Sequence, residues 1–457
     1  MAGIGFELRR ILQRDSYAAL LQAYGYAGVI SSGPWVLSIL GVMLVGYLSL
    51  DGIEAARDVG QFLVSVTHLM AASLIFTGSL QLVFTRFVAD REFEKKKRLV
   101  FSNLCGVLTL VTLAATAAAW VLGSTLFADT GMLYRMIMGS TLVALCNIWM
   151  VVIFLTGMKR YRRIVMAFFW AYSAALLAGL ALRQYGVEGL LAGFLFGQVI
   201  LLFLLLGRVA REIPGDALSS FSFLRPSQSY YVLVPVGLLY NLGVWIDKYL
   251  FWYHPATSQA VIGPLRASLI YDLPIFLAYL SIIPGMAIFL IRVETDFADA
   301  YKRFYDAVRD GDALDHISHH KQDMISAVRN GLYDIFKVQG LTVVVLFIFA
   351  ERILEMIGLS QLYLPLLKVD LVGVGVQVLL LAVLNVLFYL DLRLQALGIC
   401  LLFAVGNALF TWMTQQLGPQ FYGYGFLGST LLASLIGIVI LERRLAWLEY
   451  ETFMLQR

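Results

Sequence analysis

Residues 230–252 read YYVLVPVGLLYNLGVWIDKYLFW, and this stretch decides how the rest of the chain is interpreted. It is long and apolar enough to cross a bilayer, which takes about 20 residues. It nevertheless carries Asp247 beside Lys248, with Asn241 a turn and a half earlier. A charge inside a membrane helix costs about 2.5–3.5 kcal/mol on insertion scales, so it usually faces a polar interior and has a function. The stretch therefore predicts a membrane helix whose charged side chains do not face lipid.

The next apolar segment, 265–291, repeats this combination with Arg266 and Asp272. Neighbours i and i+1 do not face each other on a helix. We therefore expect Lys248 to pair with Asp272 and Asp247 to pair with Arg266, rather than Asp247 with Lys248. Three uses of these charges stay open: a static ion pair between helices, the lining of a substrate path, and ion coupling.

The composition places these segments in a membrane protein. The chain has 457 residues, of which 60% are hydrophobic and only 14% are charged, whereas a soluble domain has about 25% charged residues. The apolar runs are long and continuous, so the spans are helices and not barrel strands. Cys105, Cys146 and Cys400 each fall inside an apolar run and indicate neither a disulfide framework nor a metal site.

Apolar segments of membrane-spanning length predict twelve transmembrane helices, with both termini in the cytoplasm. Most of the 34 Lys and Arg residues then fall in cytoplasmic segments such as 91–98 and 159–163, as the positive-inside rule requires. The predicted spans are 25–50, 61–87, 99–127, 132–157, 164–182, 188–207, 229–253, 265–291, 336–357, 366–390, 394–416 and 422–441.

The spans divide into two lobes of six helices. Gly33 and Trp35 in the first span correspond to Gly243 and Trp245 in the seventh, which is typical of transporters built from repeats around a central path. The predicted regions are an amphipathic cytoplasmic N-terminal helix in 1–24, a first lobe 25–207, a linker 208–228, a second lobe 229–441 with a cytoplasmic helical loop 292–335, and a cytoplasmic tail 442–457. The N-terminal helix lies on the membrane surface or docks on loops.

The loop 292–335 predicts two helices broken near Gly311-Asp312. His316 and His320 share a helix face at i, i+4, as some metal ligands do, but no Cys accompanies them. A solvated, hydrophilic surface explains them better, so we expect no metal. Docking of a cytoplasmic partner suits this loop better than metal binding.

Motifs for enzymatic chemistry are absent from the sequence. It contains no phosphate-binding Gly-x-x-x-x-Gly-Lys-Ser/Thr, no His-Glu-x-x-His and no Gly-x-Ser-x-Gly. We therefore expect neither an enzyme nor a cofactor, and we expect no nucleic acid among the partners. The energy for transport then comes from an ion gradient, a partner or the growing substrate.

The candidate substrate path combines ionisable, amide and aromatic side chains, which suit the polar edges and apolar faces of sugars. Its predicted residues are Trp35, Asn241, Trp245, Asp247, Lys248, Arg266, Tyr271 and Asp272.

An ordered set of short motifs resembles one known family. The motifs are MAGIGFELRRIL at 1–12, SSGPW at 31–35, WIDK at 245–248, YDLP at 271–274, IPG at 283–285 and ETDF at 294–297. They resemble the PelG family, the inner-membrane transporters of the Pel exopolysaccharide system of Gram-negative biofilm bacteria. The likeness runs from Met1 to the last span.

The resemblance implies a fold of the superfamily that includes MATE exporters and lipid-linked sugar flippases. It also implies an N-acetylhexosamine polymer as cargo and three partners: a cytoplasmic glycosyltransferase (PelF), a cyclic-di-GMP receptor (PelD) and PelE. We expect a transporter that carries polysaccharide from its synthase to the periplasm. The alternatives are a lipid-linked oligosaccharide flippase, a cation-coupled small-molecule antiporter, and a scaffold that transports nothing.

Overall fold

The computed structural model describes residues 22, 24–28, 38, 40–46, 48, 49, 53–157, 161–212, 219–226 and 228–454. Of the predicted amphipathic region 1–24, the structure describes residues 22 and 24, both helical, and the rest of that region and Trp35 lie outside the described residues. Within the first predicted span, 25–50, residues 25–28 and 40–46 are helical.

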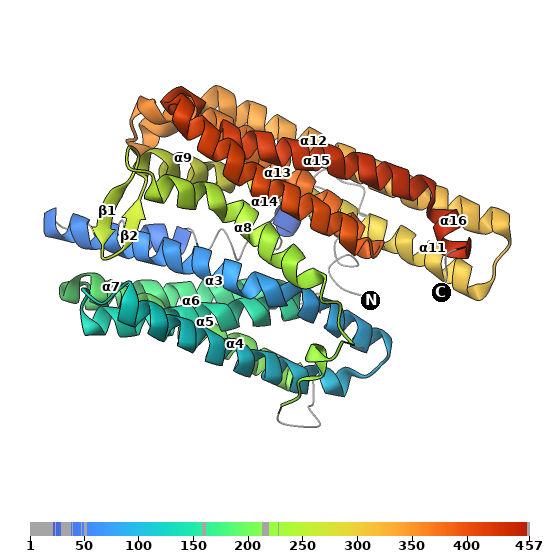
Figure 1. Cartoon of the computed structure of the whole chain (residues 1–457), viewed down its shortest axis with the longest axis horizontal. Coiled ribbons are helices and arrows are strands. Elements are labelled where there is room, and N and C mark those ends of the chain that lie inside the picture. Colours follow the sequence, from blue (N-terminus) through green and yellow to red (C-terminus); the bar gives the residue numbers. More distant parts are fainter. Residues whose placement is uncertain are drawn as a thin grey trace. The chain divides into compact units, whose positions relative to one another are not determined.

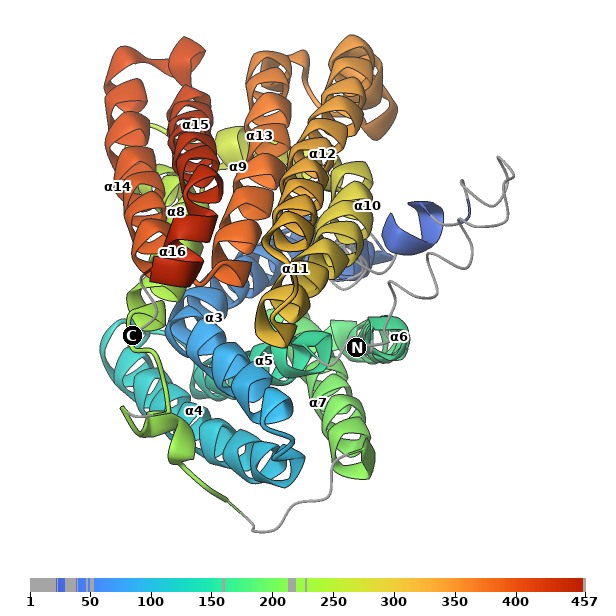
Figure 2. The same ribbon diagram turned by 90° about the vertical axis from the view of Figure 1, so that its right-hand side faces the viewer.

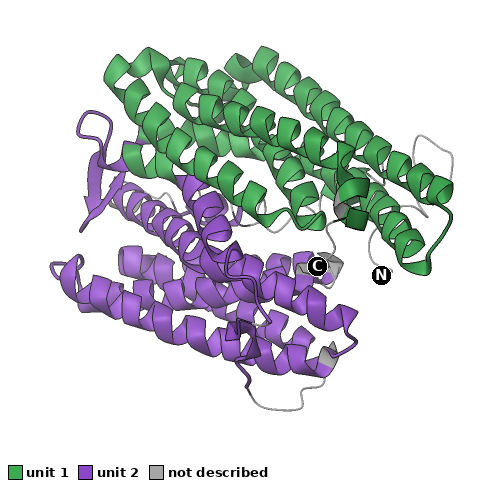
Figure 3. Cartoon of the chain, turned by 45° about the vertical axis from the view of Figure 1, so that its right-hand side comes forward, with its two compact units in different colours: residues 1–32, 246–250, 269–457 green, residues 33–245, 251–268 purple. Residues whose placement is uncertain are grey.

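The chain forms two compact units (Figure 3). Unit 2 comprises Gly33–Trp245 and Phe251–Ser268, and unit 1 comprises Met1–Ser32, Ile246–Leu250 and Leu269–Arg457. The helix α8 (Leu233–Tyr253) supplies residues to both units.

Unit 2 is a bundle of long apolar helices around a core of aliphatic and aromatic side chains (Figure 1). Phe62, Phe84 and Phe194 are fully or almost fully buried in that core. The helices are α3 (Ile53–Phe93), α4 (Lys97–Thr125), α5 (Met132–Gly157), α6 (Tyr161–Leu182) and α7 (Gly186–Glu212), with short 3₁₀ turns at Arg183–Tyr185 and Ser222–Leu224.

Two glycines bring α3 and α8 into backbone contact within unit 2. A Cβ added to Gly237 would lie 2.1 Å from the carbonyl oxygen of Gly78, which is far inside the contact distance of two atoms. Small residues let membrane helices approach closely and gain packing contacts. Any larger residue at Gly237 would therefore force these two helices apart.

A short hairpin follows α8 and was not predicted from the sequence. Strands β1 (Gln259–Ile262) and β2 (Leu265–Ala267) pair antiparallel, with Ile262 opposite Leu265. Gly263 has φ +51° and precedes Pro264, the pattern of a tight two-residue turn with glycine first. The predicted span 265–291 therefore begins as a strand, and its helix starts only at Leu269.

Unit 1 contains the remaining helices, and α14 and α15 pack closely in it, with α13 beside α15 (Figure 1). Its helices are α9 (Leu269–Leu280), α10 (Ile282–Ile291), the π-helical turn Arg292–Phe297, α11 (Ala298–Asp310), α12 (Leu314–Ile357), α13 (Leu364–Tyr389), α14 (Arg393–Leu417), α15 (Tyr424–Ala446) and α16 (Leu448–Met454), with 3₁₀ turns at Gln361–Tyr363 and Pro419–Phe421.

The helices α11 and α12 are the two that the loop 292–335 predicts. They are separated at Gly311, whose φ of +74° ends α11 in the left-handed conformation that favours glycine. No break occurs at residue 336, and α12 runs without interruption beside α10, α11 and α13 (Figure 2). The loop and the next span therefore share one helix of 44 residues.

The predicted spans from 61–87 onward lie largely on helix, although 265–291 begins with strand β2. Eight helical stretches among the described residues are long and apolar enough to cross a membrane, and two of these, Arg163–Arg211 and Leu269–Asp310, join more than one α-helix. The chain is thus an all-α polytopic membrane protein.

Candidate functional site

Asp247 and Lys248 are almost completely shielded in the middle of α8. Their side chains are 0% and 1% exposed. The Lys248 ammonium lies 3.0 Å from Oδ2 of Asp247 and 3.2 Å from Oδ1. We expected no pair between these neighbours, and that expectation is wrong. Helix geometry separates short side chains at positions i and i+1, whereas the flexible stem of Lys248 is long enough to fold back onto the Asp247 carboxylate.

Two further donors converge on the Asp247 carboxylate within unit 1. The Tyr271 hydroxyl of α9 donates to Oδ2 at 2.6 Å, and the Asn407 amide of α14 donates to Oδ1 at 3.3 Å. Thr411 in turn donates to the Asn407 oxygen at 3.0 Å. The buried Asp247 carboxylate thus has a hydrogen-bond partner at both of its oxygens, as buried polar groups usually do.

The Lys248 ammonium also lies near two aromatic rings. Its Nζ is 5.2 Å from the ring centroid of Tyr279 on α9 and 5.3 Å from that of Phe426 on α15. A cation within about 6 Å of an aromatic face is attracted by the ring quadrupole, and the attraction is stronger away from water. The ammonium is therefore held by one carboxylate and two rings.

A second carboxylate, Asp370 of α13, completes the group and was missed by sequence reasoning. It is fully buried, and neither carboxylate oxygen has a hydrogen-bond partner in the described part of the chain. Lys248 and Asp247 interact electrostatically with the Asp370 carboxylate. The sequence could have indicated it, because Asp370 is an acidic residue inside the apolar predicted span 366–390. We call Asp247, Lys248, Tyr271, Tyr279, Asp370, Asn407 and Phe426 the charged cluster.

Asn241 and Trp245, also on α8, belong to unit 2. The Asn241 amide donates to the carbonyl of Gly237 in its own helix at 2.9 Å. The Trp245 ring is buried, with its centroid 6.3 Å from that of Trp252. The Trp252 ring lies against the His68 ring of α3, with centroids 4.1 Å apart and the rings tilted by 30°. Trp245, Trp252 and His68 thus form an aromatic group within unit 2.

Arg266 has other surroundings than those we expected, and the pairing of Asp272 with Lys248 stays a prediction. Arg266 lies on strand β2 and donates to the hydroxyl and the carbonyl of Ser258, at 2.9 and 3.3 Å, instead of pairing with Asp247. Asp272 is half-buried in the first turn of α9, next to Tyr271. The structure thus brings Asp247, Lys248 and Tyr271 together and places Arg266 in the hairpin.

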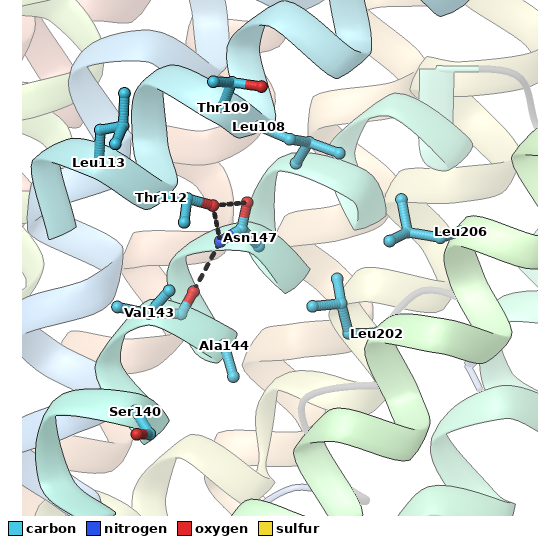
Figure 4. Close-up of a pocket in the computed structure, with 10 residues that line it drawn as sticks. All are labelled: Leu108, Thr109, Thr112, Leu113, Ser140, Val143, Ala144, Asn147, Leu202 and Leu206. Atoms are coloured by element: carbon cyan, nitrogen blue, oxygen red, sulfur yellow. Dashed lines mark hydrogen bonds between the residues drawn. The ribbon is translucent and has the colours of Figure 1, made fainter. Parts of the chain in front are cut away.

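Unit 2 contains a pocket of about 510 Å³ between α4, α5 and α7 (Figure 4). The Asn147 amide donates to the Thr112 hydroxyl and to the carbonyl of Val143, both at 2.9 Å. Leu113 at its edge is 66% exposed. The pocket contains none of the predicted path residues.

The histidines of α12 are exposed or half-exposed. The rings of His316 and His320 lie 5.4 Å apart, and His316 is 3.5 Å from Asp312. Among the residues that the structure describes, no group of three or more His, Cys, Asp or Glu side chains is arranged to hold a metal ion.

Comparison with solved structures shows which fold this is. A multidrug-resistance MATE transporter of the MOP superfamily in its outward-facing conformation superposes with a TM-score of 0.67 at 14% identity, covering 93% of this chain and 96% of that one. A MOP superfamily transporter from Pyrococcus furiosus with a binding pocket of reverse polarity gives 0.65 at 13% identity, with coverages of 93% and 96%. A MATE transporter in the straight conformation gives 0.67 at 13% identity, again with coverages of 93% and 96%.

Comparison of sequences shows the family. No curated protein matches the chain. The model of the PelG family, described as an exopolysaccharide exporter (EPS-E), matches residues 1–453. The chain therefore belongs to the PelG family of exopolysaccharide exporters, and it is a membrane transporter with the MATE fold and not an enzyme.

Proposed function

We propose that this protein exports an N-acetylhexosamine polysaccharide across the bacterial inner membrane, from a cytoplasmic glycosyltransferase to the periplasm. The observation that carries the proposal is the charged cluster, a buried set of two carboxylates and one ammonium inside the helix bundle of an exopolysaccharide exporter family. Such groups are expensive in a membrane and mark transport pathways. A PelF-like synthase supplies the polymer, and PelD- and PelE-like membrane proteins complete the assembly, with both termini of this chain in the cytoplasm.

The half-buried polar residues contact the polymer, and the fully buried ones respond to it. Asn241, Arg266 and Asp272 are each partly exposed and carry amide, guanidinium or carboxylate groups that hydrogen-bond sugar hydroxyls and acetamides. Trp35 supplies a ring that stacks on sugar faces. Asp247 and Lys248 hold charge beside the path, and they become accessible together with the Tyr271 hydroxyl and the buried Trp245 ring when the transporter changes conformation.

A second candidate function is export driven by a cation gradient, and Asp370 favours it. An ionised carboxylate buried without hydrogen bonds is costly, so Asp370 is stabilised by taking up a proton or a small cation. One ammonium, Lys248, lies among two carboxylates, and it is hydrogen-bonded to Asp247. Uptake and release at Asp370 then alternate with the direction in which the transporter opens.

Export is tested in vesicles that contain this protein with purified glycosyltransferase and labelled UDP-sugar. We expect labelled polymer on the side opposite the enzyme, and we expect Lys248→Met to abolish this transfer, measured per amount of folded protein, while polymer synthesis stays unchanged. The matched control is Lys368→Met, which removes a half-buried lysine from α13, two residues from Asp370.

The same vesicles separate the alternatives. Transfer that stops when the ion gradient is collapsed supports cation coupling, and transfer that persists shows that synthesis drives export. Unchanged transfer by Lys248→Met removes the charged cluster from the mechanism. If no polymer crosses in any preparation, the protein assembles the synthase and does not transport.

A further inference from the structure

The helix that carries Tyr271 and Tyr279 is interrupted shortly after Tyr279. The helix α9 ends at Leu280 and α10 begins at Ile282, and the Ser281 amide donates to Ala278 at 2.9 Å with the tighter i→i−3 spacing. Pro284 contributes to the interruption because it has no N–H to give to the carbonyl of Leu280. Pro274, by contrast, lies inside α9, which continues through it.

A side chain from another helix is inserted at the interruption. The Gly285 amide donates to Oε1 of Gln339 at 3.1 Å, and Nε2 of Gln339 donates to the carbonyl of Ser281 at 3.2 Å. In an unbroken helix, the Gly285 amide would donate directly to the Ser281 carbonyl, four residues earlier. The Gln339 carboxamide therefore stands between the two groups of one main-chain hydrogen bond and replaces that bond with two.

The surrounding residues leave room for this amide and for nothing larger. A Cβ on Gly285 would lie 2.4 Å from Oε1 of Gln339, so only glycine fits there while the amide is inserted. A Cβ on Gly375 of α13 would lie 3.5 Å from the Gln339 stem. Gln339 is only 2% exposed, so no bulk water competes for its hydrogen bonds. The insertion is a built feature of α9, α10, α12 and α13.

Two arrangements of this joint satisfy the same backbone groups. With the amide inserted, Ser281 and Gly285 bond to Gln339. With the amide withdrawn, they bond to each other and the helix straightens at this point, apart from the kink that Pro284 imposes. Inserted side chains are a recognised cause of helix kinks, and a bend with two satisfied states is the kind of element that a transporter can switch.

The joint lies between the charged cluster and the π-helical turn. On one side, α9 presents Tyr271 to Asp247 and Tyr279 to Lys248. On the other side, α10 continues into the π-helical turn, where Arg292 pairs with Asp334 of α12 at 2.8 Å. We propose that Gln339 is a positioning residue whose inserted amide sets the bend between α9 and α10 and thereby holds both tyrosines against the Asp247–Lys248 pair.

The first test measures the bend directly and does not depend on export. Spin labels at Leu269→Cys and Lys302→Cys, both exposed positions, report the distance across the joint in a background whose three cysteines are replaced by alanine. Gln339→Leu has a similar size but cannot form either hydrogen bond, so we expect a longer distance as the helix straightens. The control is Thr342→Val, which removes a hydroxyl that bonds only to Val338 of its own helix.

The second test uses Gln339→Glu, because its hydrogen-bonding capacity depends on protonation. A neutral carboxylic acid can accept from Gly285 and donate to Ser281 as the amide does, whereas an ionised carboxylate has no donor for Ser281. Ser281, Gly285 and Gly375, which meet the amide, carry no charge. We expect the wild-type distance in acid and the Gln339→Leu distance in alkali, and no such change for the wild-type protein.

The last readout rests on the proposed function. In the vesicle assay, Gln339→Leu should lose most polymer transfer and Thr342→Val should not. Identical distances for the wild type, Gln339→Leu and Gln339→Glu at both pH values would overturn the proposal. A changed distance with intact transfer would also overturn it, whereas absence of transfer in the wild type would refute only the proposed function.

Discussion

At the residue scale, the charged cluster shows which part of a site a sequence reveals. Asp247, Lys248 and Tyr271 were predicted because charges and hydroxyls are conspicuous in apolar runs. Asp370 was missed although the same signal was present, and the pairing was wrong because partners from α9, α13, α14 and α15 are set by packing. Which partner a lysine side chain contacts depends on those neighbouring helices and not on its position along its own helix.

The buried ion pair leads to a prediction about stability. Asp247→Asn leaves the Lys248 ammonium without its nearest carboxylate, and breaking one side of a buried pair costs about 3–5 kcal/mol. We expect a large drop in the thermal unfolding temperature in detergent. The double variant with Lys248→Met should recover part of the loss, since the ammonium that lost its partner is then absent.

The outcome also reports on Asp370. If Asp247→Asn unfolds at the wild-type temperature, the Lys248 ammonium has moved to Asp370, and the two carboxylates are interchangeable partners. If the double variant is no more stable than the single one, the loss comes from the Tyr271 and Asn407 hydrogen bonds to Asp247.

At the element scale, helix content was predictable and the interruptions were only partly so. The apolar runs predict the helices, and Gly311 predicts the end of α11, because glycine readily adopts the left-handed conformation found there. Pro284 is visible in the sequence, but Gln339 is far from it along the chain, so its insertion is a consequence of tertiary packing. The hairpin β1–β2 was not predicted, because its first strand and its turn lie in the connection between the predicted spans 229–253 and 265–291.

The close approach of α3 and α8 leads to a second prediction. Gly237→Ala places a methyl group where the Gly78 carbonyl lies, and backbone cannot move aside as a flexible side chain can. Overpacking of this kind costs about 1–3 kcal/mol or more. We expect a clearly lower unfolding temperature and less folded protein by size-exclusion chromatography.

Gly340→Ala is the matched control for this helix crossing. Gly340 lies inside α12, and a Cβ there meets nothing within 4 Å. Alanine in a helix interior is better than glycine by about 0.5–1 kcal/mol, so this variant should be as stable as the wild type or more stable. Equal effects of the two substitutions would show that α3 and α8 do not touch at Gly237.

At the scale of the whole molecule, the composition predicts the class of protein, and the distribution of Lys and Arg predicts its orientation. The low charged fraction requires a membrane protein, and the ordered motifs identify the family that the match over residues 1–453 shows. The orientation rests on the positive-inside rule alone. The two units also do not follow boundaries that could be drawn along the sequence. A segment of α8, Ile246–Leu250, belongs to unit 1 although the residues on both sides of it belong to unit 2.

The orientation gives a prediction for the intact protein. With the C-terminus in the cytoplasm, a fluorescent protein fused after Arg457 should fluoresce, and alkaline phosphatase fused there should be inactive. A phosphatase fusion after Pro255, beyond the end of α8, should be active because the predicted orientation places that connection in the periplasm. The reverse pattern would invert every loop assignment.

The unbroken helix α12 has a mechanical consequence. Its 44 residues span about 66 Å at 1.5 Å per residue, roughly twice the thickness of the hydrocarbon layer. Gln339 lies about 38 Å along it from Leu314. Because α12 has no hinge, a tilt imposed near Leu314 is transmitted along the whole helix. It therefore also displaces the Gln339 amide and the bend between α9 and α10 that the amide holds.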